Sequence, residues 1–255
     1  MEFNCRTWKQ RKVYKTGFLL FLFFLSSHYV YAQTADEVIN KYVAFTGGEK
    51  QWKSVKSIIT SGEYSYGGVA FPFKAYSKAP NQYKFVVTLN GKYYAQAFDG
   101  KSGWKIDVFN GETVPALLTG KAALAMANEA DVDLEDALID YKNKGHQASM
   151  DGKDSVQEKL CFKIKFIRKN GETETCYFEE KTAELVMKKA VAKNPELGGA
   201  ILTILYSDYR TVNNIKIPFK TIAKTEDQTI LTININKAEI NTTIDDKEFQ
   251  WQGNQ

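Results

Sequence analysis

The chain has 255 residues, of which 25% are charged and 13% are aromatic. Its first 32 residues hold five of the 34 basic residues and one of the 30 acidic residues, so residues 33–255 carry 29 of each. This balance gives no electrostatic reason to expect a nucleic-acid partner. No proline- and serine-rich linker or charge block divides residues 33–255, so we expect a single domain.

Residues 1–32 have the pattern of a secretory signal peptide. Basic residues from Arg6 to Lys15 precede the apolar run GFLLFLFFLSS, and Val30 and Ala32 stand at the −3 and −1 positions of a cleavage site. The apolar run is shorter than the about 20 residues that a membrane-spanning helix needs. We therefore expect export, cleavage before Gln33, and a soluble protein.

The first element expected after this leader is an amphipathic helix over residues 34–48, in which Val38, Tyr42 and Phe45 recur at helical spacing. The chain then alternates apolar and polar residues in short runs such as YKFVVTLN and WKIDVFNG, joined by turns such as Asn90-Gly91. We count about eleven or twelve short strands. This pattern indicates a mainly β fold, either a sandwich or a barrel.

The strand pattern stops between Pro115 and Tyr141. The stretch LLTGKAALAMANEA is rich in alanine and leucine, which favour helix. The next stretch, DVDLEDALIDYKNKG, has an amphipathic helical pattern with Asp133 as the expected N-cap. A helix that is apolar nearly all round must be covered on all sides. We therefore expect the two helices to lie across the open face of a curved sheet as a lid.

The chain contains no nucleophile elbow, zinc-binding motif or phosphate-binding loop. The acidic run over residues 131–136 lacks the glycine and terminal glutamate of a calcium loop, and reads as a solvated helix face. His146 is the one histidine after the leader. An exported hydrolase that uses His146 is an alternative, but we expect no catalytic residue, metal site or cofactor.

Aromatic residues are concentrated on the expected strands between residues 71 and 109. Strands alone would favour a packed sandwich core. The apolar helical insert instead favours an apolar cavity, since a filled sandwich needs no lid. The residues that we expect to bind a ligand there are Phe71, Phe73, Tyr83, Phe85, Trp104, Leu117, Leu118, Leu124, Met126 and Leu138, with Leu134 as a further lid residue.

Cys161 and Cys176 lie on two strands of a hairpin across Asn170-Gly171. A two-residue turn places Cys161 opposite Glu180, and a three-residue loop places it opposite Glu179. In either register the cysteines are offset by three or four residues, roughly 10–13 Å along the strands. Disulfide geometry allows only about 7 Å between Cα atoms. We therefore expect two thiols.

Four stretches follow one another in a distinctive order: ADEVINKYVAFTGGEKQWKSVKSI, FDGKSGW, DYKNKGH and YSDYRTVNNIKIPF. In this order they resemble the LolA- and LolB-like lipoprotein carriers, the outer membrane lipoprotein-sorting proteins, and the likeness covers Gln33 to Phe249. The resemblance implies an unclosed, strongly curved antiparallel sheet. Such a half-barrel has about eleven strands around an apolar cavity, with an N-terminal helix and a helical lid in its opening.

The resemblance also implies a function. The protein would be a monomeric, non-enzymatic periplasmic carrier of the acyl chains of lipoproteins or of a lipid-like ligand, with membrane-bound donor and acceptor proteins as partners. The arginine that locks the lid in such carriers would be Arg168 or Arg210, the two arginines after the leader. The remaining alternative is an envelope protein with a structural or sensory role that binds another protein.

Overall fold

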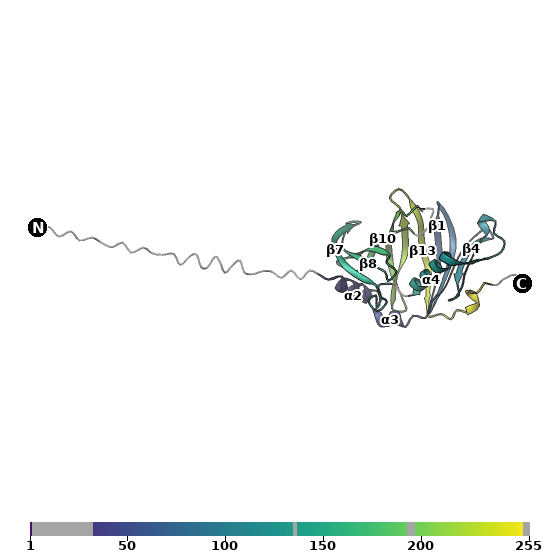
Figure 1. Ribbon diagram of the computed structural model, residues 1–255, viewed down its shortest axis with the longest axis horizontal. Helices are drawn as coiled ribbons and strands as arrows, with labels where there is room; N and C mark the ends of the chain where they lie inside the picture. The colour runs from purple at the N-terminus through teal and green to yellow at the C-terminus, as the bar shows by residue number, and fades with distance from the viewer. Residues whose placement is uncertain (2–32, 135–136, 193–196, 252–255) are drawn as a thin grey trace. The chain divides into compact units, whose positions relative to one another are not determined.

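The structure, a computed structural model, describes Met1 and residues 33–134, 137–192 and 197–251 (Figure 1). Its helices are α2 (Ala35–Phe45), α3 (Glu49–Lys53), α4 (Gly120–Leu134) and the 3-10 helices η2 (Val108–Asn110) and η4 (Asp246–Glu248). Its strands are β1 (Ser57–Tyr66), β2 (Val69–Lys78), β3 (Gln82–Leu89), β4 (Lys92–Phe98), β5 (Gly103–Asp107), β6 (Ala116–Leu118), β7 (Gln147–Val156), β8 (Lys159–Ile167), β9 (Thr173–Glu179), β10 (Leu185–Val191), β11 (Ile201–Val212), β12 (Ile215–Lys224) and β13 (Thr229–Ile240). The expected mainly β fold is confirmed.

The strands of the described residues form one antiparallel sheet in the order β6-β5-β4-β3-β2-β1-β13-β12-β11-β10-β9-β8-β7. Two meanders, β1–β6 and β7–β13, meet along the β1–β13 pair. The sheet is strongly curved and unclosed, as expected, with β6 and β7 as its edges. It has thirteen strands rather than about eleven. One of the additional strands is the short β6, which pairs with β5 where we expected helix.

This strand order explains why the chain interrupts its strands with a helix. The connection between β6 and β7 must lead from one edge of the sheet to the other. Helix α4 begins this crossing and contacts β2, β3, β4 and β5. Because it lies over the sheet, it needs an apolar surface toward the strands, and its buried residues Met126 and Ala130 supply part of this surface.

We call the sheet face that packs against α2, α4 and residues 137–141 the inner face, and the opposite one the outer face. Residues paired across neighbouring strands lie on the same face of the sheet. Followed from strand to strand, these pairs show that Phe98 on β4, Tyr64 on β1, Ile233 on β13 and Ile164 on β8 all lie on the inner face. We call the end of the sheet at the turns of residues 67–68 and 90–91 the rim, and the opposite end the base.

The inner face of β8–β10 is filled by α2. The helix begins with a reciprocal cap, in which the Thr34 hydroxyl accepts from the Glu37 N–H and the Glu37 carboxylate accepts from the Thr34 N–H. The buried face of α2 forms one hydrophobic core cluster with the strands. The main members of that cluster are Val38, Ile39, Tyr42, Leu138, Tyr141, Phe162, Ile164, Phe166, Cys176, Phe178 and Leu185.

Helix α3 closes the base of the central strands. The indole N–H of Trp52 donates to the Thr46 hydroxyl at 3.0 Å, and Trp52 packs with Ile139 and Ile215. Gly47, at φ +120°, is needed here because a Cβ would lie 2.3 Å from the carbonyl oxygen of Asn214. In Figure 1, α2 and α3 lie at the lower edge of the sheet.

The prediction of a second helix over residues 131–145 is wrong. Its first residues continue α4 as far as Leu134, residues 135–136 lie outside the described residues, and residues 137–145 form turns. Ala137, Leu138 and Ile139 are all buried, and Leu138 packs under α2 while Ile139 packs under β1. Three consecutive residues cannot share one helix face, and Asp140 has a positive φ of 51°. The side chain of Leu134 is outside the described set.

The two cysteines lie as predicted. Cys161 pairs with Glu179 and Cys176 with Ile164, which is the register of the three-residue loop. The Arg168 N–H donates to the Glu172 carbonyl at 2.8 Å and closes that loop. Both cysteines are buried and no disulfide joins them.

Candidate ligand-binding site

Aromatic side chains gather on the inner face of β1, β2 and β3. The rings of Tyr64 and Phe85 meet edge to face at 5.4 Å, Phe85 stacks on Phe73 at 5.8 Å, and Tyr64 stacks on Tyr66 at 6.4 Å. Phe71 lies on the same face and contacts Phe109 of η2. We call Tyr64, Tyr66, Phe71, Phe73 and Phe85 the aromatic band.

The aromatic band is only partly covered. Phe73 is buried, Tyr64, Phe71 and Phe85 are half-buried, and Tyr66 at the rim is 47% exposed. Burial raises the pKa of the Tyr64 hydroxyl, with a smaller contribution from Tyr66. Apolar surface that is half-buried on a curved face can take up a ligand without displacing a packed core.

Helix α4 covers the base side of this surface. Met126 and Ala130 are buried against Phe98, and Tyr83 and Leu118 pack beside them. A Cβ at Gly103 would lie 3.1 Å from the Met126 sulfur, so the glycine makes room for the helix. The structure therefore brings Tyr83, Leu118 and Met126 together at the edge of the aromatic band.

Four of the expected ligand-binding residues lie elsewhere, three of them on the outer face or exposed and the fourth, Leu138, in the core of the other half. Trp104 faces outward, where its indole N–H donates to the Phe249 carbonyl at 2.9 Å. Leu117 pairs with Trp104 and is 50% exposed, and Leu124 on α4 is 63% exposed. The expectation that Leu117 and Leu124 face the inner aromatic residues is wrong. Leu124 stands two residues from Met126, about 200° around the helix, so the two cannot face the sheet together.

Leu138 is buried, but on the other half of the sheet. It packs with α2 and the core cluster of β8 and β9 rather than with the aromatic band. Residues that sequence reasoning missed are Tyr64, Tyr66, Leu231 and Ile233, which the register places on the inner face. The alternation in GEYSYGG and TILTININ carries this signal.

Charged side chains lie on the inner face of the filled half. Glu174 Oε1 accepts from Arg168 Nε at 2.6 Å, and Lys188 Nζ lies 3.6 Å from Glu174 Oε2. Burial raises the pKa of Glu174, but Lys188 and Arg168 outweigh this and hold the pKa below its usual value. Arg210 instead pairs with Asp208 and lies over the Phe219 ring at 4.5 Å.

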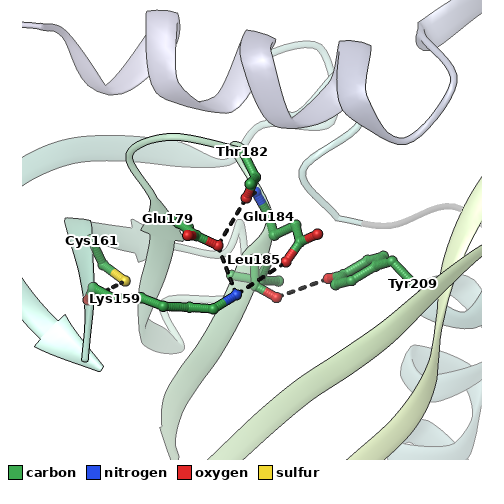
Figure 2. A network of polar contacts seen from close by, with 7 residues as sticks. All are labelled: Lys159, Cys161, Glu179, Thr182, Glu184, Leu185 and Tyr209. Atoms are coloured by element: carbon green, nitrogen blue, oxygen red, sulfur yellow. Dashed lines mark hydrogen bonds and ion pairs between the residues drawn. The ribbon is translucent and has the colours of Figure 1, made fainter. Parts of the chain in front are cut away.

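Polar contacts also join the base ends of β8 to β11 (Figure 2). Lys159 Nζ lies 2.7 Å from Glu179 Oε2 and 3.4 Å from Glu184 Oε2, while the Tyr209 hydroxyl donates to the Leu185 carbonyl at 2.8 Å. These contacts connect four neighbouring strands. The half of the sheet that α2 fills is therefore held together both by its core and by these polar contacts at its base.

His146 stands just before β7. Its Nδ1 accepts from the Lys169 N–H at 3.0 Å, and its ring lies 5.4 Å from that of Phe166. Burial, with nearby Arg168 and lysines, lowers the pKa of His146. Within the described residues, no hydrogen bond links His146 to a serine.

The described residues contain no cluster of three or more His, Cys, Asp or Glu side chains that could hold a metal ion. Across the same residues, no helix combines the length and apolarity needed to cross a membrane.

No protein-family model matches the chain, and no curated protein matches its sequence. Solved structures do match its fold. A DUF1329 family protein from Desulfovibrio piger has a TM-score of 0.59 at 13% identity, over 86% of this chain and 98% of that one. A LolA superfamily protein from Nitrosomonas europaea has a TM-score of 0.53 at 10% identity, also over 86% and 98%.

A third similar structure is a domain from Vibrio parahaemolyticus described as that of an outer membrane lipoprotein-sorting protein. It has a TM-score of 0.52 at 10% identity, over 84% of this chain and 95% of that one. These likenesses confirm the LolA-like fold that the sequence resemblance implied. At such identities they concern the fold alone.

Proposed function

We propose that the protein is a periplasmic, non-enzymatic carrier that holds an acyl chain of a lipoprotein or of a lipid-like ligand. The observation that carries this proposal is the aromatic band, which lies half-buried on one half of a curved sheet whose other half is filled. The similarity in fold to a lipoprotein-sorting domain supports the same ligand class.

The proposed site consists of the aromatic band, Tyr83, Leu118 and Met126. The acyl chain would enter from the rim, beside Tyr66, and extend along Phe85 and Phe73 toward α4. Deeper entry would displace Met126 from Phe98. Arg168 pairs with Glu174 on β9 and Arg210 with Asp208 on β11, and neither is part of the proposed site.

The energies of binding and of lid displacement are comparable. Exposing a buried methionine costs about 1.5–3 kcal/mol, and each buried CH₂ of an acyl chain contributes about 0.8 kcal/mol. A chain that buries about four methylenes therefore offsets the displacement of Met126. For longer chains, the free energy gained by burial exceeds the cost of displacing Met126. A membrane-bound acceptor with a less hydrated site would bind such a chain more tightly and so remove it. Such a balance suits reversible carriage.

Native mass spectrometry of protein isolated from the periplasmic fraction tests the proposal. We expect a lipid or acylated adduct that dissociates on activation. Protein without such an adduct would count against carriage, and one stoichiometric protein partner without lipid would favour the sensory alternative.

Titration with a fluorescent fatty acid locates the site. We expect Phe85→Asp on the aromatic band to weaken binding at least tenfold, about 1.4 kcal/mol. Ile201→Asp is the matched control, because Ile201 is exposed on the outer face of β11. Equal binding by Phe85→Asp and the wild type would remove the aromatic band from the site.

A further inference from the structure

A cavity lies on the outer face, away from the aromatic band. It has a volume of about 690 Å³, within the about 300–1,000 Å³ range of small-molecule sites. Its floor is made of Val86 on β3, Ala95 on β4, and Trp104 and Ile106 on β5. The C-terminal segment, residues 245–251, forms the opposite wall, and in Figure 1 it lies on the β4 side of the sheet.

This wall is attached at defined points. Phe249 is fully buried with Ile59 and Ile244, and its carbonyl accepts the Trp104 indole N–H. Lys84 Nζ lies 3.0 Å from Glu248 Oε2. Since Phe249 holds the segment in place, the residues on either side of it stand over the floor. The cavity is therefore bounded by two attached surfaces rather than by a loose tail.

The polar groups of the cavity balance in charge. Two lysines, Lys84 and Lys247, and two carboxylates, Asp245 and Glu248, line the cavity, and Gln250 adds a neutral amide. An anion would meet two carboxylates and a cation would meet two ammonium groups. Hydroxyl groups both donate and accept, so they match a wall that offers carboxylate acceptors and ammonium and amide donors.

Aromatic side chains stand at the mouth of the cavity. Tyr93 on β4 is 39% exposed and Trp251 is 37% exposed, and Pro115 adds a third flat surface. The negative face of an aromatic ring attracts weakly positive C–H groups. A ligand with one C–H face and many hydroxyls would use the aromatic rims, the apolar floor and the balanced polar wall together.

We propose that this outer cavity binds a neutral saccharide, with its C–H face on Trp251 or Tyr93 and its hydroxyls on Glu248, Asp245 and Lys84. A fatty acid fits less well, because its chain would have to pass four charged side chains. The outer site is separate from the proposed acyl site on the inner face. The two could be occupied together.

Titration of the full exported chain with maltotriose, cellotriose and the trimer of N-acetylglucosamine tests the proposal, followed by tryptophan fluorescence and saturation-transfer NMR. We expect at least one trisaccharide to saturate the protein with a dissociation constant of about 1 mM. We expect Trp251→Ala to weaken that binding at least about tenfold and Glu248→Gln to weaken it about threefold. Saturation by none of the three would overturn the proposal.

Tyr66→Ala is the matched control, since Tyr66 is an exposed aromatic residue on the inner face. It should leave the saccharide affinity unchanged. Equal loss in Tyr66→Ala and Trp251→Ala would place the saccharide on the inner face and overturn the outer site. A bound saccharide should not displace the fluorescent fatty acid, so failure of this proposal and failure of the acyl-carrier proposal give different results.

Discussion

The two halves of one sheet differ in what covers their inner faces. On β8–β10, Ile164, Phe166 and Phe178 are fully buried under α2, whereas on β1–β3 four of the five side chains of the aromatic band are half-buried or exposed. The helices account for the difference. Helix α2 contributes Val38, Ile39 and Tyr42, which are large enough to fill the space.

Helix α4 contributes smaller side chains. Met126 is the one large residue among its described buried side chains, beside Ala130. Alanine methyl groups reach only a short way toward the strands, so an alanine-rich helix covers a concave surface without filling it. The comparison teaches that side-chain size on the covering helix decides which half is packed core and which half keeps its aromatic side chains partly exposed.

The largest expected effect comes from the filled half. Phe178→Ala should lower the free energy of unfolding by about 3–5 kcal/mol, because it removes a buried ring from the α2 cluster. Denaturant unfolding measures this loss. Where the variant is still folded, its affinity for the fluorescent fatty acid should match the wild type. A large loss of affinity in folded protein would break the distinction between the halves.

The reverse pattern is expected for Phe85→Ala in the aromatic band. Because the Phe85 ring is half-buried, its removal should lower the free energy of unfolding by about 1–2 kcal/mol, while the affinity for the fatty acid should fall about tenfold. Parallel unfolding and binding titrations measure both quantities. Ile201→Ala serves as the control for loss of apolar surface, and a stability loss as large as that of Phe178→Ala would show that Phe85 belongs to the core.

The lid offers a sharper comparison within one helix. Met126→Asp places a carboxylate against Phe98, so the lid should close less well and the fatty-acid dissociation rate should rise about fivefold. Leu124→Asp changes an exposed residue and should alter stability by less than about 0.5 kcal/mol, with an unchanged rate. Stopped-flow displacement measures the rates. Equal rates in both variants would mean that α4 does not gate release.

Sequence alone was sufficient for the features that depend on local pattern. Period-2 alternation predicted the strands, and hairpin register predicted that Cys161 and Cys176 could not meet. The prediction for Trp104 was wrong, because the sheet face on which Trp104 lies depends on the length of the turn before β5. That turn has four residues, from Asp99 to Ser102, and the Asp99 N–H donates to the Ser102 carbonyl to close it. A one-residue error in such a turn moves every following side chain to the other face.

The second helix failed for a different reason. Its amphipathic spacing is real, but tertiary contacts bury Ala137, Leu138 and Ile139 in succession. Leu138 and Ile139 belong to separate clusters, under α2 and under β1, and only an irregular backbone reaches both. The partners in these clusters are distant in the sequence. No local pattern could have indicated them.

The smallest expected effect is a pH dependence of the filled half. Glu174 has its pKa lowered from 4.5 by Lys188 and Arg168 against the opposing effect of burial. A carboxyl group with a lower pKa in the folded state stabilises the fold above its unfolded pKa, and this contribution is lost as the pH falls through the folded value. Glu174→Gln removes the titrating group. The stability difference between wild type and variant should therefore be constant near pH 7 and shrink below about pH 4.5.

Unfolding midpoints from pH 7 to pH 3 measure this difference. Glu226→Gln is the matched control, because Glu226 is exposed in the turn between β12 and β13 and should give no such change. Fatty-acid affinity at pH 7 should be the same in Glu174→Gln and the wild type, since the ion pairs lie on the filled half. A pH-independent stability difference would mean that Glu174 contributes by packing alone. An altered fatty-acid affinity would mean that the acyl site extends past the β1–β13 pair into the half that α2 fills.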